Sequence, residues 1–227
     1  MPFTFLYTTD LHGNTAGYLK ILDYVQEKDI KLIHLGADIL PKGSGILGLQ
    51  KKFVNDFLKK FYGICRDKGI DVLASFGNDD IYTRKKYFRK YGSLLDEDEY
   101  LRDGYKFIAY NFVPDYPFGL KTACKNDYDG WTCPDPQLGK PVDVTDKEGI
   151  IDIPNRLEYL AKKGTIEDDL KNLKGGPRTI AAIHCPPAGA RLDVCYGNRC
   201  VGSRSVLQWI MREQPAICLC GHIHESR

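Results

Sequence analysis

The sequence predicts an α/β fold with mainly parallel strands in its N-terminal half. Three apolar runs typical of buried strands occupy residues 3–8, 31–35 and 71–76. Segments with helical periodicity separate them. Alternation of strand and helix implies right-handed crossovers, which make successive strands parallel. A chain of 227 residues that is 43% hydrophobic can bury the core of one such domain, spanning residues 1–227.

The spacing of apolar residues predicts the two helices between these strands. Leu19, Leu22 and Val25 lie on one face of the first helix. The second is a long amphipathic helix over residues 47–68, followed by Gly69 in the position that favours a left-handed end. Both patterns are those of helices with one buried side.

The later elements are shorter and interrupted by one long segment. Helices are expected at 82–91, 155–162, 165–173 and 203–214, and strands at 105–110, 179–183 and 218–220. From about residue 111 to 150 the periodicity dissolves into Pro, Gly, Asp, Lys and aromatic residues. Because long loops in compact domains tend to be functional, we expect an irregular insertion near the working edge of the sheet.

Composition narrows the classes of function. The 32 basic and 30 acidic residues leave a net charge of +2, which gives no global argument for binding nucleic acid or an anionic membrane. No apolar run approaches the roughly 20 residues of a spanning helix, and the N-terminus lacks a basic leader. The chain is therefore predicted to be soluble and cytoplasmic.

The eight cysteines fit reduced residues better than a disulfide framework. Several lie in or beside apolar strand and helix patterns, namely Cys65, Cys185, Cys218 and Cys220. The absence of a Cys-x-x-Cys pair disfavours a thiolate zinc site. Disulfides between Cys195 and Cys200, or between Cys124 and Cys133, remain alternatives.

Metal-ligand residue types follow five of the predicted strands. The apolar run 218–220 ends in Gly221 and then two histidines one residue apart. The carboxyl ends of parallel strands meet at one edge of a sheet, where open α/β sheets bind their ligands. Imidazole is the commonest protein metal ligand. The candidate ligands at this edge are Asp10, His12, Asp38, Asn78, His184, His222 and His224.

In chain order these motifs resemble the signature of the calcineurin-like metallophosphoesterases. The matching stretches run from Asp10-Leu-His12 through Gly36-Ala-Asp38, Gly77-Asn-Asp79 and His184 to Gly221-His-Ile-His224. The resemblance implies a four-layer α/β/β/α sandwich with metals at the strand ends. It further implies one ion on Asp10, His12 and His224, and a second on Asn78, His184 and His222. Asp38 would bridge them.

The resemblance implies a dinuclear phosphoesterase that acts on a phosphomonoester or phosphodiester, either a small molecule or a phosphoprotein. A hydroxide held between the two ions would be the nucleophile, because metals depress the pKa of bound water. Mixed nitrogen and oxygen ligands suit two divalent or trivalent transition-metal ions rather than calcium. We expect manganese first, with iron, zinc, cobalt or nickel as alternatives.

Three positions depart from the family pattern. Asp79 stands where many members have a histidine that protonates the leaving group, and a carboxyl donates a proton only when its pKa is raised. Ala37 occupies the usual glycine position before Asp38. The chain also ends three residues after His224, where members usually continue, so we expect closing strands to be missing.

Asp79 and Asp80 are the candidate catalytic residues outside the ligand set. Asp80 would either steady Asn78 or a ligand from behind, or serve as an ordinary carboxylate at a helix N-terminus. Two other functions stay open: a non-catalytic metal-binding scaffold for protein interactions, and a nuclease, which the charge balance does not favour. The sequence leaves the oligomeric state open.

Overall fold

The computed structural model describes residues 3–95, 98–145, 147 and 149–226. Its first sheet has four strands in chain order, and all three neighbouring pairs are parallel. The strands are β1 (Leu6–Thr8), β2 (Leu32–Leu35), β3 (Asp71–Ala74) and β4 (Ser93–Leu94). The predicted parallel sheet of the N-terminal half is therefore confirmed.

The second sheet has the order β14-β11-β6-β5. Its strands are β5 (Tyr100–Arg102), β6 (Tyr105–Tyr110), β11 (Thr179–Ile183) and β14 (Ile217–Leu219). β6, β11 and β14 are parallel, whereas β5 runs antiparallel to β6. Sequence reasoning missed β4 and β5, because two or three residues are too few to display a strand period.

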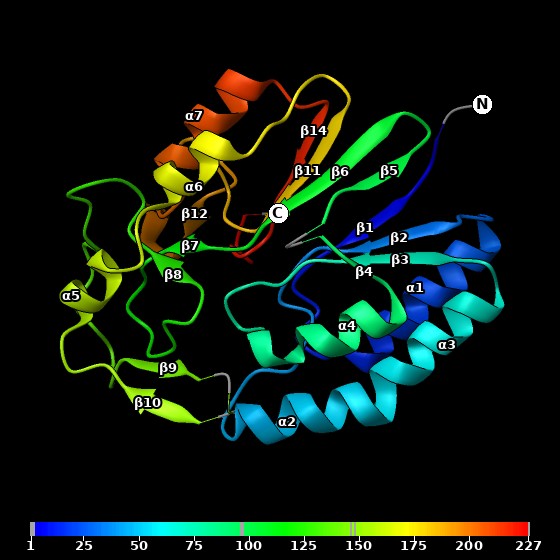
Figure 1. The fold of residues 1–227 in the computed structure, drawn as a ribbon, viewed down its shortest axis with the longest axis horizontal. Helices are drawn as coiled ribbons and strands as arrows, with labels where there is room; N and C mark the ends of the chain where they lie inside the picture. The colour runs from blue at the N-terminus through cyan, green and yellow to red at the C-terminus, as the bar shows by residue number, and fades with distance from the viewer. Residues whose placement is uncertain (1–2, 96–97, 146, 148, 227) are drawn as a thin grey trace.

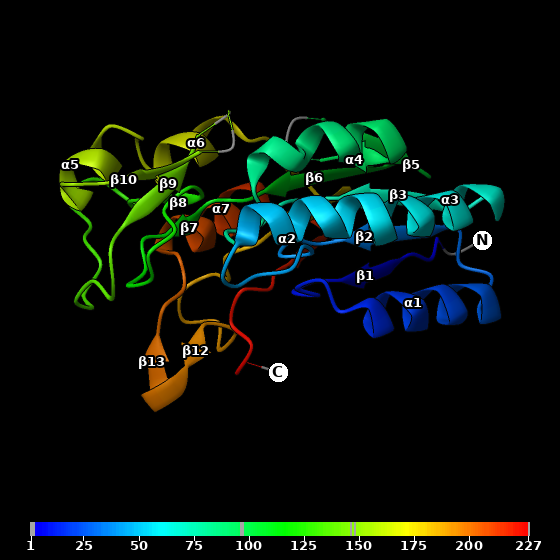
Figure 2. The same cartoon turned by 90° about the horizontal axis from the view of Figure 1, so that it is seen from below.

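The two sheets pack face to face, with helices outside (Figures 1 and 2). Side chains alternate along a strand, so Ile33 and Val72 pack with helices, while Leu32 and Leu73 pack against Phe107 of the second sheet. Helices α1 (Thr15–Glu27), α3 (Lys59–Asp67) and α4 (Lys85–Tyr91) contribute to the core on one side. Helices α6 (Ile166–Asn172) and α7 (Arg204–Glu213) do so on the other. The order helix, sheet, sheet, helix is that of the expected sandwich.

The long helix expected at 47–68 is continuous but not uniform. It consists of α2 (Ile46–Phe53), a π-helical stretch η1 (Val54–Leu58) and α3. Gly69 has φ of 65°, its N–H donates to the carbonyl of Arg66, and the N–H of Ile70 donates to that of Cys65. The predicted glycine ending is confirmed. The helix expected at 82–91 starts with a 3₁₀ turn, η2 (Tyr82–Arg84), before α4.

The segment after β6 is more ordered than an irregular insertion. β7 (Val113–Pro114) pairs with β8 (Cys124–Lys125), and β9 (Val142–Val144) pairs with β10 (Ile150–Asp152). Helix α5 (Arg156–Ala161) follows, and a hairpin of β12 (Val194–Cys195) and β13 (Arg199–Cys200) precedes α7. That all these parts form a single domain over residues 1–227 stays a prediction.

Two further observations bear on the expectations from composition. All eight cysteines are free, including Cys195 and Cys200 on facing strands of the hairpin. Among the described residues, no helix is long and apolar enough to cross a membrane.

Candidate metal centre

The carboxyl ends of five parallel strands supply all seven predicted ligands. In the first sheet, β1 leads to Asp10 and His12, β2 to Asp38, and β3 to Asn78. In the second sheet, β11 leads to His184, and β14 to His222 and His224. Because the sheets pack face to face, these loops converge into three overlapping groups of potential ligand atoms.

The first cluster consists of Asp10, His12 and His224. Nε2 of His224 lies 3.3 Å from Nε2 of His12 and 3.4 Å from Oδ1 of Asp10, and His12 Nε2 lies 4.0 Å from the same oxygen. Ligand atoms bound at about 2.1 Å in a tetrahedron are about 3.4 Å apart. Two imidazole nitrogens and a carboxylate at this spacing are a donor set that fits a divalent transition metal.

The second cluster consists of Asp38, His184 and His222, with Asn78 beside it. Nε2 of His184 lies 3.3 Å from Oδ2 of Asp38 and 3.0 Å from Oδ1 of Asn78. The rings of His184 and His222 are 5.1 Å apart. This donor set also fits a transition-metal ion, and it lies deeper, since the side chains of His184 and Asp38 are 1% and 3% exposed.

A third group joins the first two. It contains His12 of the first cluster, Asp38 of the second, and Asp79. The backbone N–H of Asp79 donates to Oδ1 of Asp38 at 2.8 Å, which leaves the other carboxylate oxygen facing His184. Asp38 is therefore placed between the two clusters.

Comparison with known proteins identifies the family. The family model of the calcineurin-like phosphoesterases matches residues 3–226. The chain belongs to this family. Membership implies metal-dependent hydrolysis of phosphoesters. Among functionally curated proteins, none matches the sequence.

Solved structures agree with the family fold. One crystal structure shares 15% identity with a TM-score of 0.58, the match covering 98% of this chain and 85% of that one. The crystal structure of TT1561 of Thermus thermophilus also shares 15% identity, with a TM-score of 0.52, covering 95% of this chain and 80% of that one. Similarity at this identity establishes the fold of this calcineurin-like phosphoesterase and leaves its substrate open.

Burial favours the neutral, ligand-competent state of two imidazoles of this family member, those of His12 and His222. Burial and the neighbouring His184 lower the pKa of His222 to about 3, and burial also lowers the pKa of His12. His184 differs: burial opposes its charge, but the Asp38 carboxylate outweighs burial and raises the pKa. Burial, with the Asp38 charge, raises the pKa of Asp79 to about 6. The site thus combines imidazole nitrogens with a carboxyl, that of Asp79, that holds its proton more readily than usual.

The ligand loops contain a concentration of left-handed backbone. Positive φ angles occur at five non-glycine positions here: Asp10 (54°), His12 (43°), Ala37 (105°), Asp38 (46°) and His222 (70°). Such conformations cost free energy and cluster at functional sites. Ala37 has the least favourable φ of the five for a residue with a side chain, which explains why a glycine is expected before Asp38. Its carbonyl accepts from the N–H of Asp10, so this strained turn joins the two ligand loops.

Two glycines allow the loops to approach each other. A Cβ atom on Gly77 would overlap the carboxylate of Asp38, and one on Gly221 would overlap that of Asp10. The N–H of His222 donates to both oxygens of Asp10, at 3.2 and 3.1 Å. Backbone contacts therefore hold these carboxylates in place.

Asp80 has a structural position behind the ligands. Its carboxylate accepts hydrogen bonds from three backbone N–H groups, those of Ile39 (3.2 Å), Leu40 (2.8 Å) and Gly77 (3.0 Å). It lies outside the three ligand groups and ties the Asp38 loop to the Asn78 loop. The sequence allowed two interpretations of Asp80. This contact pattern favours the one in which Asp80 supports the loop that carries Asn78, over that of an ordinary carboxylate at a helix N-terminus.

Two residues near the site were missed by sequence reasoning. Nζ of Lys42 lies 3.2 Å from Nε2 of His12 and 3.6 Å from Oδ2 of Asp79. The ring of Tyr116, in the segment after β6, is 6.1 Å from that of His222. Neither lies in a motif, and both reach the site only through the folding of loops, so no local pattern could have revealed them.

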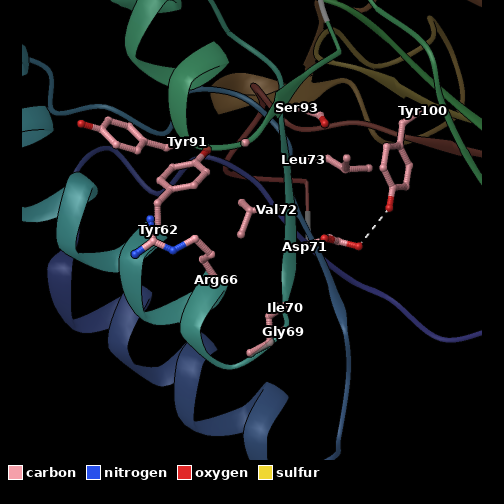
Figure 3. Close-up of a pocket in the computed structure, with 11 residues that line it drawn as sticks. Tyr62, Arg66, Gly69, Ile70, Asp71, Val72, Leu73, Tyr91, Ser93 and Tyr100 are labelled. Carbon is pink, nitrogen blue, oxygen red and sulfur yellow. Dashed lines mark hydrogen bonds between the residues drawn. The ribbon is translucent and has the colours of Figure 1, made fainter.

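Cavities occur at both ends of the sheets. One of about 310 Å³ adjoins the first cluster and is lined by Asp10, His224, Leu192 and Ile223, among others. Another, of about 190 Å³, lies beside the amino-terminal half of β3, where Tyr62 and Tyr91 are on the side of Val72 and Tyr100 is across the strand, next to Asp71 (Figure 3). Because β3 begins there, this second cavity is at the edge opposite the metal ligands.

Proposed function

We propose that this protein is a dinuclear metal-dependent phosphoesterase that hydrolyses a phosphomonoester or phosphodiester. The observation that carries the proposal is the position of Asp38. Its carboxylate belongs both to the group with His184 and His222 and to the group with His12 and Asp79. A single carboxylate between two sets of nitrogen ligands is the arrangement that a bridging ligand requires.

The ligand assignment that we propose has one ion on Asp10, His12 and His224, and a second on Asn78, His184 and His222, with Asp38 shared. Two such ions would supply an activated water as nucleophile and would neutralise the charge on the phosphoryl group. We expect manganese first, with iron, zinc, cobalt or nickel as alternatives.

The remaining residues would act on the leaving group and on the charge of the substrate. Asp79 is grouped with His12 and Asp38, so its carboxyl is placed to donate a proton to a departing oxygen at this site. Lys42 has a half-exposed side chain beside His12 and Asp79, where its positive charge favours an anionic phosphate. Asp80 positions the two loops and does not touch the reacting atoms.

The test is substitution of the shared carboxylate. Asp38→Asn should lower metal content and reduce kcat/KM for p-nitrophenyl phosphate and bis-p-nitrophenyl phosphate with Mn²⁺ more than about 100-fold, since even residues behind the ligands cost 10- to 100-fold. Asp67→Asn is the control, because Asp67 is an exposed carboxylate in the last turn of α3. Full metal content and full rate in Asp38→Asn would remove the bridging assignment.

The same measurements address the alternatives. The complete ligand set supports an enzyme over a non-catalytic scaffold, and no described feature favours a nuclease. Metal-loaded protein that hydrolyses neither ester, across the metals named above, would favour the scaffold. The free cysteines suit a reducing compartment, and we propose a cytoplasmic location on that ground.

A further inference from the structure

A row of four aromatic rings leads from the buried ligands to the protein surface. The ring of His184 contacts that of His222 at 5.1 Å between centroids. His222 contacts Tyr116 at 6.1 Å, and Tyr116 contacts Phe118 at 5.8 Å. His184 is buried, Tyr116 is half-buried, and Phe118 is 63% exposed. The row therefore ends in a large apolar ring that faces solvent two ring contacts away from a metal ligand.

The loop that carries these rings is firmly held. Asp115 and Lys121 form an ion pair of 2.8 Å with both side chains almost fully buried, and Arg156 lies 3.4 Å from the same carboxylate. Nζ of Lys121 also donates to the carbonyl of Tyr116, and the Tyr116 hydroxyl donates to that of Leu120 at 2.8 Å. A buried ion pair adds little net stability compared with apolar packing. What these contacts do is fix the backbone on either side of the two rings.

An exposed phenylalanine on a fixed loop, two ring contacts from His222, is suited to stacking against a planar ring. Offset or tilted aromatic contacts add favourable free energy beyond that of burying apolar area. An aromatic side chain can stack against any nucleobase, because every base has a π-face. With the phosphoryl group held at the ions, a substrate whose organic part extends past Tyr116 would meet the exposed ring of Phe118.

We propose that the substrate carries a planar aromatic ring, as in an aryl or nucleoside phosphoester, and that this ring stacks on Phe118. The inference rests on the proposed function and adds a substrate class to it. Phe118 is then a specificity-determining residue, and Tyr116 supports it from the side of His222.

The experiment compares three monoesters with Mn²⁺-loaded protein: p-nitrophenyl phosphate, adenosine 5′-monophosphate and glycerol 2-phosphate. Phe118→Ala should raise KM for an aromatic ester about 5- to 20-fold with little change in kcat, and should change KM for glycerol 2-phosphate less than twofold. Phe118→Tyr keeps the ring and should restore the wild-type KM. Tyr24→Ala is the matched control, because Tyr24 is a 49% exposed aromatic residue near the end of α1.

Each outcome decides the proposal. An effect on adenosine monophosphate alone supports a nucleobase, one on p-nitrophenyl phosphate alone supports a simple aryl group, and an effect on both supports the shared chemistry. An equal rise in KM for all three esters, or no change, overturns the role of Phe118 and leaves the phosphoesterase assignment intact. Wild-type protein that hydrolyses none of them overturns the aromatic monoester as substrate, and if it also fails to hydrolyse bis-p-nitrophenyl phosphate, it overturns both proposals.

Discussion

The two ligand clusters have similar chemistry and different environments. In the first, the side chain of His224 is 45% exposed, whereas in the second that of His184 is 1% exposed. The difference follows from the position of the strands. The first cluster draws on β1 and β14, the edge strands of their sheets, while Asp38, Asn78 and His184 follow interior strands. Except for His222, which also follows β14, placement within the sheet thus accounts for the difference in exposure between the two clusters.

The difference in burial between the two clusters should affect how firmly each holds a metal ion. A buried set of ligands holds an ion in surroundings of low dielectric, where charge interactions are strong. An exposed set leaves room for water and substrate to reach the ion. We expect the second cluster to retain its ion and the first to exchange it, and four predictions test the contrast.

The largest effect is expected where the buried cluster is broken. His184→Ala should remove the ion of the second cluster and lower kcat/KM more than about 100-fold, because even outer residues of metal sites have effects approaching that size. It should also destabilise the metal-free protein by about 3 kcal/mol, since the buried Asp38 carboxylate loses its partner. Metal analysis and thermal unfolding measure the two effects. Retention of two ions by the variant would contradict the assignment.

Asp79, which belongs to the group that joins the two clusters, should affect only the protonation of the leaving oxygen. Asp79→Asn removes the carboxyl proposed to protonate the leaving oxygen, so hydrolysis of an alkyl phosphate should slow about 100-fold. Hydrolysis of p-nitrophenyl phosphate should slow less than tenfold, because p-nitrophenolate departs without a proton. Steady-state rates for both esters give the comparison. Equal losses would assign Asp79 to metal binding instead.

Graded chelation tests the contrast directly. As chelator is added to fully loaded protein, about one ion per chain should leave first, from the exposed cluster. His224→Ala should abolish this first phase and spare the second, because His224 serves only the first cluster. Elemental analysis after rapid desalting counts the ions at each stage. Loss of both ions together in the wild-type protein would show that the difference in burial has no effect on retention.

The smallest effect concerns the strained turn beside Asp38. Ala37→Gly should stabilise the protein by up to about 1 kcal/mol, because φ of 105° is unfavourable for alanine, although glycine loses more entropy on folding. The melting temperature should rise by about 2–4 °C for a chain of this size. Calorimetry of metal-free protein isolates this effect. A fall in melting temperature would mean that the methyl group of Ala37, which is buried, contributes more by packing than the turn costs.

The sequence was sufficient for those parts of the fold that depend on local periodicity. The parallel strands, the long helix with Gly69 at its end and the helix expected at 203–214 are all present, the last as α7 with the Ser203 side chain accepting from the N–H of Val206. The seven candidate ligands could be predicted from the sequence for a related reason. Each directly follows an apolar run, and parallel strands bring such positions together.

What escaped prediction depends on contacts between distant residues. The short strands after β6 exist because each finds a partner, and the ion pair of Lys121 with Asp115 orders a loop whose composition suggested irregularity. The π-helical stretch of residues 54–58 has the same apolar spacing as the helix around it. Lys42 reaches His12 only because the Asp38 loop folds back on the Asp10 loop, through hydrogen bonds between their backbones.

The first cluster has one more consequence. His12 and His224 are 212 positions apart in the chain, yet their ring nitrogens almost touch. An ion bound between them would be a long-range cross-link from one edge strand of the first sheet, β1, to one edge strand of the second, β14, and it would close nearly the whole chain into a loop. The entropy of closing so long a loop is large, so metal uptake should protect the amides of β14 from hydrogen exchange far more than those of β6.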